Sequence, residues 1–151
     1  REAVRSGALE RLRAETLGFV FQDYHVLGHR TVTENLELKL AINATPVEQR
    51  AAMVDDVLQS VGLTERAKAL TRLLSGGEKQ RLAIARAIIS HPQVLLADEP
   101  TGNLDEANAR VVLDLFDEQA ARDVAVVVIT HDERISSWAD RVVHLRDGRI
   151  D

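Results

Sequence analysis

The sequence has no cysteine, which excludes a disulfide scaffold and a zinc site built from cysteine ligands. It also lacks any cluster of Lys and Arg, and its formal net charge is −5. A nucleic-acid-binding protein usually carries a basic stripe, so we expect no nucleic-acid partner. The longest strongly apolar run, residues 124–129, is too short to cross a bilayer. We therefore expect any membrane role to depend on a partner protein.

The 151 residues are 45% hydrophobic and 28% charged, which suits one domain or a large part of one. Residues 8–14 have helical spacing, and residues 17–21 form a short apolar run. Residues 94–97 and 124–129 are apolar throughout, which predicts strands of a parallel sheet that is covered on both faces. The pattern between these runs is mostly helical, so the sequence predicts an α/β core with a helical insert at about residues 24–90.

Short polar motifs predict where helices begin. Three segments have the S/T-x-x-E form of a capping box, which places helix starts at Thr31, Thr45 and Ser75. Asp105 is expected to cap the helix after the second apolar run. Residues 142–150 predict a final hairpin with Asp-Gly at its turn.

The segment Ser75-Gly76-Gly77-Glu78 is suited to anion binding. The first turn of a helix has unpaired N–H groups and the positive end of the helix dipole, and both attract phosphate. Glycine has no side chain, so the two glycines allow an anion to approach the backbone closely. Taken alone, the segment is better explained as a capped helix after a flexible turn. The continuation KQRLAIAR at residues 79–86 is not needed for capping and favours a functional interpretation.

Two adjacent carboxylates, Asp98 and Glu99, follow the second apolar run. Open α/β sheets bind ligands outside the carboxyl ends of their strands. Neighbouring carboxylates are costly there unless they share a cation or a proton. The alternative is a solvated strand end that Pro100 terminates, and the block TGNLD at residues 101–105 argues against it.

His131 follows the third apolar run, and Gln22 follows the first. A histidine alone would favour a simple capping turn, because residues 130–133 also have the S/T-x-x-E form. Gln22 alone is a weak signal, although a neutral amide can ligate Mg²⁺ or its water and still move with the adjoining loop. Residues 24–27 either pack against the helical insert or shape a groove for a membrane partner.

Five blocks stand in one order: Gln22, LSGGEKQR at residues 74–81, VLLADEP at 94–100, TGNLD at 101–105 and THD at 130–132. Together they resemble the ATP-binding domains of ABC transporters, most closely the lipoprotein-releasing and macrolide- or peptide-exporting type. The resemblance implies an α/β fold, here an incomplete P-loop NTPase (RecA-like) core of parallel sheet with an inserted α-helical subdomain. It assigns residues 1–23 and 91–151 to the core and residues 24–90 to the helical subdomain.

The resemblance also implies a role for each residue. Glu99 would polarise the attacking water, and His131 would contact the γ-phosphate and that water. Asp98 would bind Mg²⁺ directly or through its waters. Gln22 would also bind Mg²⁺ and would take part in catalysis. The nucleotide held by a second copy of the chain would be bound by Ser75, Gly76, Gly77, Glu78 and Asp105.

The implied activity is ATP hydrolysis coupled to transport, with ATP and Mg²⁺ bound. Members of this family work as head-to-tail dimers, in which the Ser75 turn of one copy caps the γ-phosphate of ATP held by the other. The implied partners are therefore a second copy and transmembrane permease subunits, which would hold the protein at the cytoplasmic face of the cell membrane.

The family also requires a phosphate-binding loop, G-x-x-x-x-G-K-[S/T]. No Gly-Lys pair occurs among the eight glycines and three lysines, so we interpret the sequence as truncated at its N-terminus. We expect these residues alone to bind and hydrolyse little ATP. Two alternatives stay open: a fragment that acts only as an interaction module, and an ABC ATPase without a transport role. The short stretch between Gln22 and Ser75 argues against the second, whose members carry long insertions there.

Overall fold

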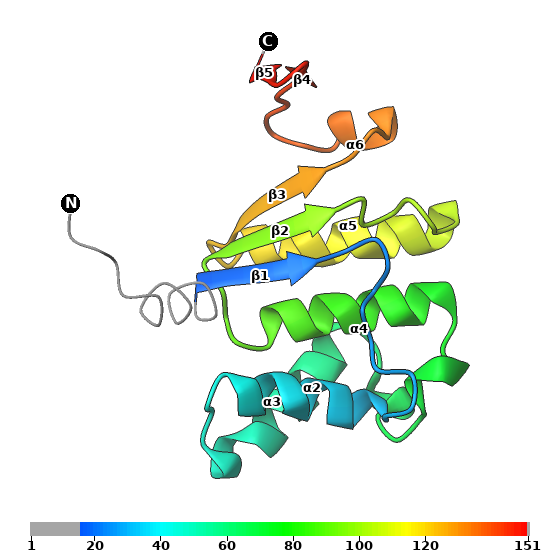
Figure 1. Cartoon of the computed structure of the whole chain (residues 1–151), viewed down its shortest axis with the longest axis vertical. Helices are drawn as coiled ribbons and strands as arrows, with labels where there is room; N and C mark the ends of the chain where they lie inside the picture. The colour runs from blue at the N-terminus through cyan, green and yellow to red at the C-terminus, as the bar shows by residue number, and fades with distance from the viewer. Residues whose placement is uncertain (1–15, 151) are drawn as a thin grey trace, which may run out of the picture.

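The computed structural model describes residues 16–150, and the predicted helical pattern at residues 8–14 lies outside them. Three parallel strands form the central sheet, in the order β1-β2-β3 (Figure 1). They are β1 (Leu17–Val20), β2 (Val94–Asp98) and β3 (Ala125–Ile129). Phe19 pairs with Leu96, and Leu96 with Val127. Because the strands run in one direction, their carboxyl ends meet at the same edge of the sheet.

Two helices, α4 (Gly76–Ile88) and α5 (Glu106–Ala120), pack against one face of this sheet (Figure 1). The side chains between them form the core, where Val20, Leu95 and Phe116 are almost fully buried. Gly18 allows the close approach of β1 to α4, since a methyl group at this position would lie 2.6 Å from the Ala87 carbonyl oxygen. The small residue at this position therefore sets how closely β1 packs against α4.

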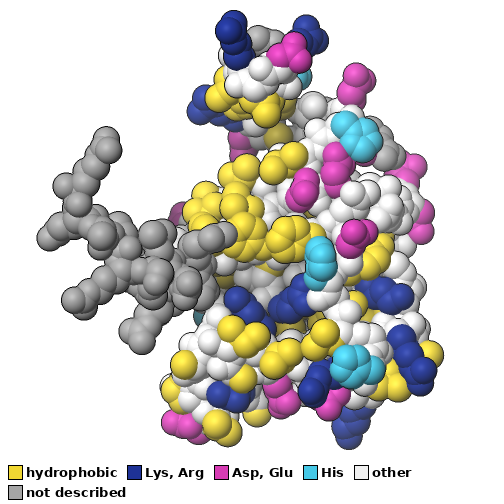
Figure 2. Space-filling view, viewed as in Figure 1, with side chains coloured by type: hydrophobic (Ala, Val, Ile, Leu, Met, Phe, Trp, Pro, Cys, Tyr) yellow, Lys and Arg dark blue, Asp and Glu magenta, His cyan; other side chains and the backbone are white. Residues whose placement is uncertain are grey.

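The opposite face of the sheet is open among residues 16–150, so the prediction that both faces are covered is wrong for this part of the chain. Alternate residues of a strand point to opposite faces. On the open face, Val127 is 47% and Ile129 is 60% exposed, and the rings of Phe19 and Phe21 stack with their centroids 6.0 Å apart. Figure 2 shows hydrophobic side chains gathered over the sheet. Apolar sequence on both faces thus predicted the strands correctly but not their surroundings.

The helical insert contains α2 (Val32–Ile42) and α3 (Val47–Ser60), followed by the short turns η1 (Thr64–Arg66) and η2 (Thr71–Leu73). Leu36, Leu40 and Leu58 of these helices are almost fully buried and belong to the same hydrophobic cluster as the sheet residues. Both α2 and α3 contact α4. The insert and the sheet therefore share one core, with α4 between them.

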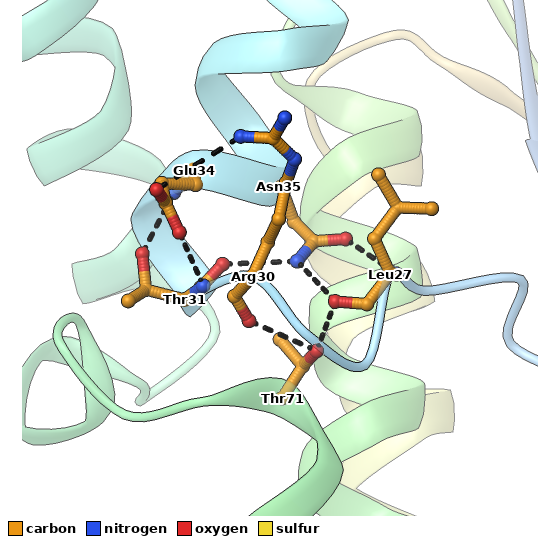
Figure 3. Close-up of polar contacts among 6 residues, drawn as sticks. All are labelled: Leu27, Arg30, Thr31, Glu34, Asn35 and Thr71. Atoms are coloured by element: carbon orange, nitrogen blue, oxygen red, sulfur yellow. Dashed lines mark hydrogen bonds and ion pairs between the residues drawn. The ribbon is translucent and has the colours of Figure 1, made fainter.

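A buried brace joins the loop before α2 to the turn before α4 (Figure 3). The Asn35 side chain accepts the Leu27 N–H at 2.8 Å and donates to the carbonyl oxygens of Leu27 at 3.3 Å and Thr31 at 2.9 Å. The Thr71 hydroxyl donates to the carbonyl oxygens of Leu27 at 2.6 Å and Arg30 at 3.2 Å. Asn35 and Thr71 are both buried, so the side-chain ends of these bonds are shielded from water, although the bonds as a whole are only partly buried.

The helix starts confirm two of the three predicted capping boxes. Thr31 caps α2 and Ser75 caps α4, each in a reciprocal contact with the Glu three residues later. The predicted cap at Thr45 is wrong, because α3 begins after Pro46 and no side chain caps it. Pro46 has an extended backbone (ψ 137°) and no acceptor in its side chain, so the helix starts one residue too late for Thr45 to cap it. Asp105 caps α5 as predicted.

The end of the chain carries α6 (Glu133–Ser136) and the hairpin of β4 (Leu145–Arg146) and β5 (Arg149–Ile150). The predicted Asp-Gly turn is confirmed, since Asp147 and Gly148 both have positive φ, 51° and 75°. Within the described part of the chain, no helix combines the length and apolar character that a membrane span requires.

Candidate functional site

Glu99 lies at the carboxyl edge of the sheet, immediately after β2. Its N–H donates to the Ile129 carbonyl at 2.8 Å, which extends the pairing with β3. The Thr130 hydroxyl donates to Glu99 Oε2 at 3.1 Å, and the His131 N–H donates to Oε1 at 3.1 Å. His131 Nδ1 also lies 2.6 Å from Oε1. The loop after β3 therefore fixes the direction of the Glu99 carboxylate.

These contacts favour the ionised form of Glu99. Burial alone raises the pKa of this carboxyl, but hydrogen bonds from His131 and Thr130 and the charge of protonated His131 together lower the pKa below its ordinary value. A carboxylate that is ionised and oriented can accept a proton or position a water molecule. The His131 side chain is 87% exposed, so its ring is accessible to a ligand at the same edge.

Asp98 and Gln22 add oxygen atoms that can bind a metal ion. Asp98 ends β2 and Gln22 follows β1, and both residues are exposed. A methyl group at Gly102 would lie 3.3 Å from the Gln22 amide nitrogen and 3.8 Å from Glu99 Cβ, so both side chains border one loop. Among residues 16–150, no three His, Cys, Asp or Glu side chains form a metal cluster. One carboxylate and one amide fit Mg²⁺, which usually keeps several waters and takes few protein ligands.

The start of α4 is exposed and capped. Ser75 Oγ accepts the Glu78 N–H at 3.2 Å, and Glu78 Oε2 accepts the Ser75 N–H at 2.8 Å. That hydrogen bond from the Ser75 backbone is the largest cause that lowers the pKa of Glu78, whose other oxygen pairs with Arg66 Nε at 2.8 Å. The other N–H groups of the first turn have no partner within the helix, which suits an anion.

The two glycines of this turn have different surroundings. Gly76 is exposed, and a methyl group there would lie 3.3 Å from the Tyr24 hydroxyl. Gly77 is buried, and a methyl group there would lie 2.0 Å from Oδ1 of Asn108 in α5. Gly77 therefore allows α4 and α5 to approach each other, a reason that the sequence interpretation did not include.

Asp105 holds Asn108 in this position. Its Oδ1 accepts the Asn108 N–H at 2.8 Å, and both of its carboxylate oxygens accept the Asn108 side-chain amide at 2.9 Å. These bonds, led by the one from the backbone, lower the pKa of Asp105. The loop at residues 101–105 thus meets the start of α4 within a single chain.

Gln80 is a residue near the site that the sequence interpretation missed. It lies in α4 after Gly77, it is 1% exposed, and its Nε2 donates to the Pro100 carbonyl at 2.8 Å. One signal was available, since an uncharged amide among the apolar positions of an amphipathic helix usually has a hydrogen-bond partner. The bond joins α4 to the residue that follows Glu99.

The predicted site residues, together with Thr130 and Asn108 that the structure places beside them, form two groups. The first, named the catalytic edge for the role predicted for it, consists of Gln22, Asp98, Glu99, Thr130 and His131. The helix-start group consists of Ser75, Gly76, Gly77, Glu78, Asp105 and Asn108. Gln80 links α4, which carries part of the second group, to the loop that follows Glu99 in the first.

A parallel α/β sheet with polar side chains at its carboxyl edge is typical of nucleotide-binding proteins, and the comparisons with known proteins identify the family. The family model described as ABC transporter matches residues 3–102, more than half of the chain. The chain therefore belongs to the ABC transporter family, as an ATP-binding domain. The predicted family and the predicted α/β fold class are both confirmed.

The relatives include ATP-binding proteins of transporters. The uncharacterized ABC transporter ATP-binding protein YvrO of Bacillus subtilis is 41% identical over 146 residues, which cover 97% of this chain and 64% of YvrO. The macrolide export ATP-binding/permease protein MacB of Escherichia coli K12 is 40% identical over 143 residues, which cover 95% of this chain and 22% of MacB. The chain thus spans less than two thirds of the length of these relatives.

A solved structure shows the same fold. The dimeric post-hydrolysis state of the ATP-binding cassette MJ0796, bound to ADP and Pi, matches with a TM-score of 0.84 and 32% identity. The match covers 98% of this chain and 66% of that one.

Proposed function

We propose that this chain is part of the ATP-hydrolysing motor subunit of a membrane transporter. The proposal rests above all on Glu99, whose carboxylate is ionised and held by Thr130 and His131 at the ligand-binding edge of a parallel sheet. The relatives support it, because MacB is named as an export ATP-binding and permease protein and MJ0796 was solved with ADP and Pi.

The catalytic edge promotes ATP hydrolysis by holding the attacking water, the γ-phosphate and Mg²⁺ in position. Glu99 orients the attacking water and accepts its proton, because its carboxylate is ionised and fixed in direction. His131 holds Glu99 through Nδ1 and offers the exposed part of its ring to the γ-phosphate. Asp98 and Gln22 would hold Mg²⁺, which when bound neutralises charge on the phosphate oxygens.

The helix-start group acts on the nucleotide of a second copy. In a head-to-tail pair, the exposed Ser75–Gly76 turn of one copy caps the γ-phosphate of ATP bound at the catalytic edge of the other. The Asp105 loop lies beside the same seam, because Asn108 holds it against Gly77. ATP then joins the copies, and hydrolysis separates them. The MJ0796 cassette is dimeric in its solved structures, which supports this arrangement.

We further propose that residues 24–90 form a helical subdomain and that residues 1–23 and 91–151 form the nucleotide-binding core. The permease partner would sit against the helical subdomain and hold the protein at the cytoplasmic face of the membrane. This division follows α2 and α3, which come between β1 and α4 in the sequence and pack on the side of α4 away from the sheet (Figure 1).

A cavity of about 290 Å³ on the subdomain supports a permease contact. Leu38 and Ile42 supply apolar walls, and Lys39 and Arg86 supply positive charge. Burial, and then the charge of Arg86, lower the pKa of Lys39. Two cations beside apolar side chains fit a permease segment that carries an acidic residue. Reversing the charge with Lys39→Glu should therefore reduce co-purification of the permease, while ATP hydrolysis by the separated ATP-binding protein stays unchanged.

The activity belongs to the full-length protein in this proposal. The 151 residues contain no Gly-Lys pair, so the phosphate-binding loop of the family is not among them. We propose that they bind Mg-ATP weakly on their own. If they act only as an interaction module, the full-length protein will not hydrolyse ATP. If the protein has no transport role, it will hydrolyse ATP but no permease will co-purify with it.

The test is Glu99→Gln in the full-length protein. Loss of one preorganised catalytic group costs about 10²–10³ in rate, so ATP turnover should fall by that factor. ATP-dependent dimerisation should persist, since the neutral amide keeps the shape of the side chain. Glu118→Gln, an exposed position on α5, is the matched control and should leave turnover unchanged. Equal turnover in the two variants would remove Glu99 from its role.

A further inference from the structure

Gln80 makes a buried hydrogen bond that leaves the other end of its side chain unpaired within residues 16–150. Its side chain is 1% exposed and lies in α4 among apolar residues. Its Nε2 donates to the Pro100 carbonyl at 2.8 Å, whereas its Oε1 is buried without a partner in the described part of the chain. An unpaired buried oxygen is unfavourable, and an apolar side chain of similar size would avoid that penalty. The amide therefore has a purpose other than filling space.

The acceptor of this bond adjoins a strained residue. Glu99 has φ 46°, in the left-handed region that residues other than glycine rarely adopt. Such a conformation persists only when the surroundings hold it in place. The Glu99 N–H is held by the Ile129 carbonyl at 2.8 Å, and the Glu99 carbonyl by the Gly102 N–H at 3.2 Å. Gln80 holds the next carbonyl group, that of Pro100.

The carboxylate of Glu99 and the turn that follows it are thus fixed from different elements. Thr130 and His131, from the loop after β3, hold the carboxylate. Gln80, from α4, holds the Pro100 carbonyl in the turn. Loss of the Gln80 bond would leave the Pro100 carbonyl buried without its donor and would release one side of the strained turn. The carboxylate would then have a wider range of directions.

We propose that Gln80 is a positioning residue for Glu99, and that it fixes the turn after Glu99 to α4 of the same chain. The inference rests on the proposed function. It also gives α4 two tasks: its first turn faces the nucleotide of the second copy, and Gln80 steadies the carboxylate that acts on the nucleotide of its own copy. A movement of α4 would therefore change the contacts of both nucleotides in the pair.

The test uses Gln80→Met in the full-length protein, since methionine has a similar length and no donor. We expect kcat for ATP hydrolysis to fall roughly tenfold to a hundredfold, because a displacement of about 1 Å at a catalytic group can cost 10² in rate. The KM for ATP should stay nearly unchanged. Combined with Glu99→Gln, the substitution should leave ATP-dependent dimerisation as strong as in Glu99→Gln alone.

The matched control is Gln119→Met on α5. Gln119 is also buried, 4% exposed, and its Nε2 has no partner in the described part of the chain. It lines a cavity at the other end of the sheet, with His91 and Val124, so its replacement should leave kcat unchanged. If Gln80→Met does not fold, Gln80→Asn keeps the amide on a shorter side chain and should lower kcat in the same way.

Three results would overturn the inference while the proposed function stands. An unchanged kcat in the Gln80 variants would show that Glu99 does not depend on the bond. Loss of ATP-dependent dimerisation in the double variant would show that Gln80 acts on the helix start instead. An equal fall in kcat with Gln119→Met would show a general effect of burial. If the unsubstituted protein hydrolyses ATP no faster than Glu99→Gln, the proposed function fails as well, and the inference fails with it.

Discussion

The buried brace and the catalytic edge are both built from short hydrogen bonds, but their surroundings differ. In the brace, Asn35 and Thr71 are uncharged, buried and bonded to backbone atoms. At the edge, the Glu99 carboxylate is charged and its side chain is 20% exposed, and the His131 side chain beside it is 87% exposed. Buried neutral networks that are fully bonded stabilise one arrangement of the chain. An ionised carboxylate with a fixed direction remains available for chemistry. Substitutions in the two regions should therefore separate stability from rate.

The largest effect on stability is expected from Asn35→Leu. Leucine leaves the Leu27 N–H and two carbonyl groups without the side-chain partner they have in the brace. The free energy of unfolding should fall by about 2–4 kcal/mol, as measured by urea unfolding of the full-length protein. Asn103→Ala, at an exposed position, should change it little. Similar unfolding midpoints for both variants would show that the brace adds nothing to the free energy of unfolding.

Thr130→Val should produce a different result, with a clear fall in rate and a loss of stability smaller than that of Asn35→Leu. It removes the hydroxyl that donates to Glu99 Oε2 at 3.1 Å. Without this bond the carboxylate is free to move, and a misplacement of about 1 Å at a catalytic group can cost about 10² in rate, so kcat should fall by about tenfold or more. Thr130→Ser keeps the hydroxyl and should retain most of the activity. A serine variant as slow as the valine variant would mean that the methyl group, not the hydroxyl, is needed.

The pH dependence of unfolding gives a smaller effect that separates the two regions. The pKa of Glu99 is lowered from its ordinary value of 4.5 in the folded protein. Its contribution to stability is therefore complete above that value and is lost as the pH falls through the folded pKa. Urea midpoints of the unsubstituted protein should decline more steeply in acid than those of Glu99→Gln. Asn35 does not titrate, so Asn35→Leu should keep the steeper decline. Parallel curves for all three would contradict the role of these contacts.

The smallest effect is expected outside both regions. Arg110 and Asp114 form an exposed i,i+4 ion pair at 3.1 Å on α5. Such pairs contribute about 0.3–0.5 kcal/mol, so Arg110→Ala should barely shift the urea midpoint and should not change kcat. A shift as large as that of Asn35→Leu would show that burial is not what distinguishes the brace.

Signals that are local in sequence predicted local structure well. The caps at Thr31, Ser75 and Asp105 use residues only a few positions apart, so the motif and its partner lie in one short segment. The cap at Thr45 failed for an equally local reason, since Pro46 delays the helix start. The residues at the strand ends could be predicted because the carboxyl ends of parallel strands share one edge.

Contacts between distant segments could not be predicted in this way. The partner of Gln80 is Pro100, and the neighbour of Gly77 is Asn108 on another helix. A motif gives the identity of such residues but not the element against which they pack. The prediction that both faces of β3 are covered failed for the same reason. Apolar residues indicate what a strand can bury, but not which element covers it.

The central claim is that the two groups of one chain act on two different nucleotides. A crystal structure of full-length Glu99→Gln with Mg-ATP tests it directly. The account predicts that the Ser75 turn of one copy lies within hydrogen-bond distance of a γ-phosphate whose nearest residue 99 belongs to the other copy. A γ-phosphate that contacts Ser75 and residue 99 of the same copy, or a Ser75 turn that faces only solvent, would contradict it.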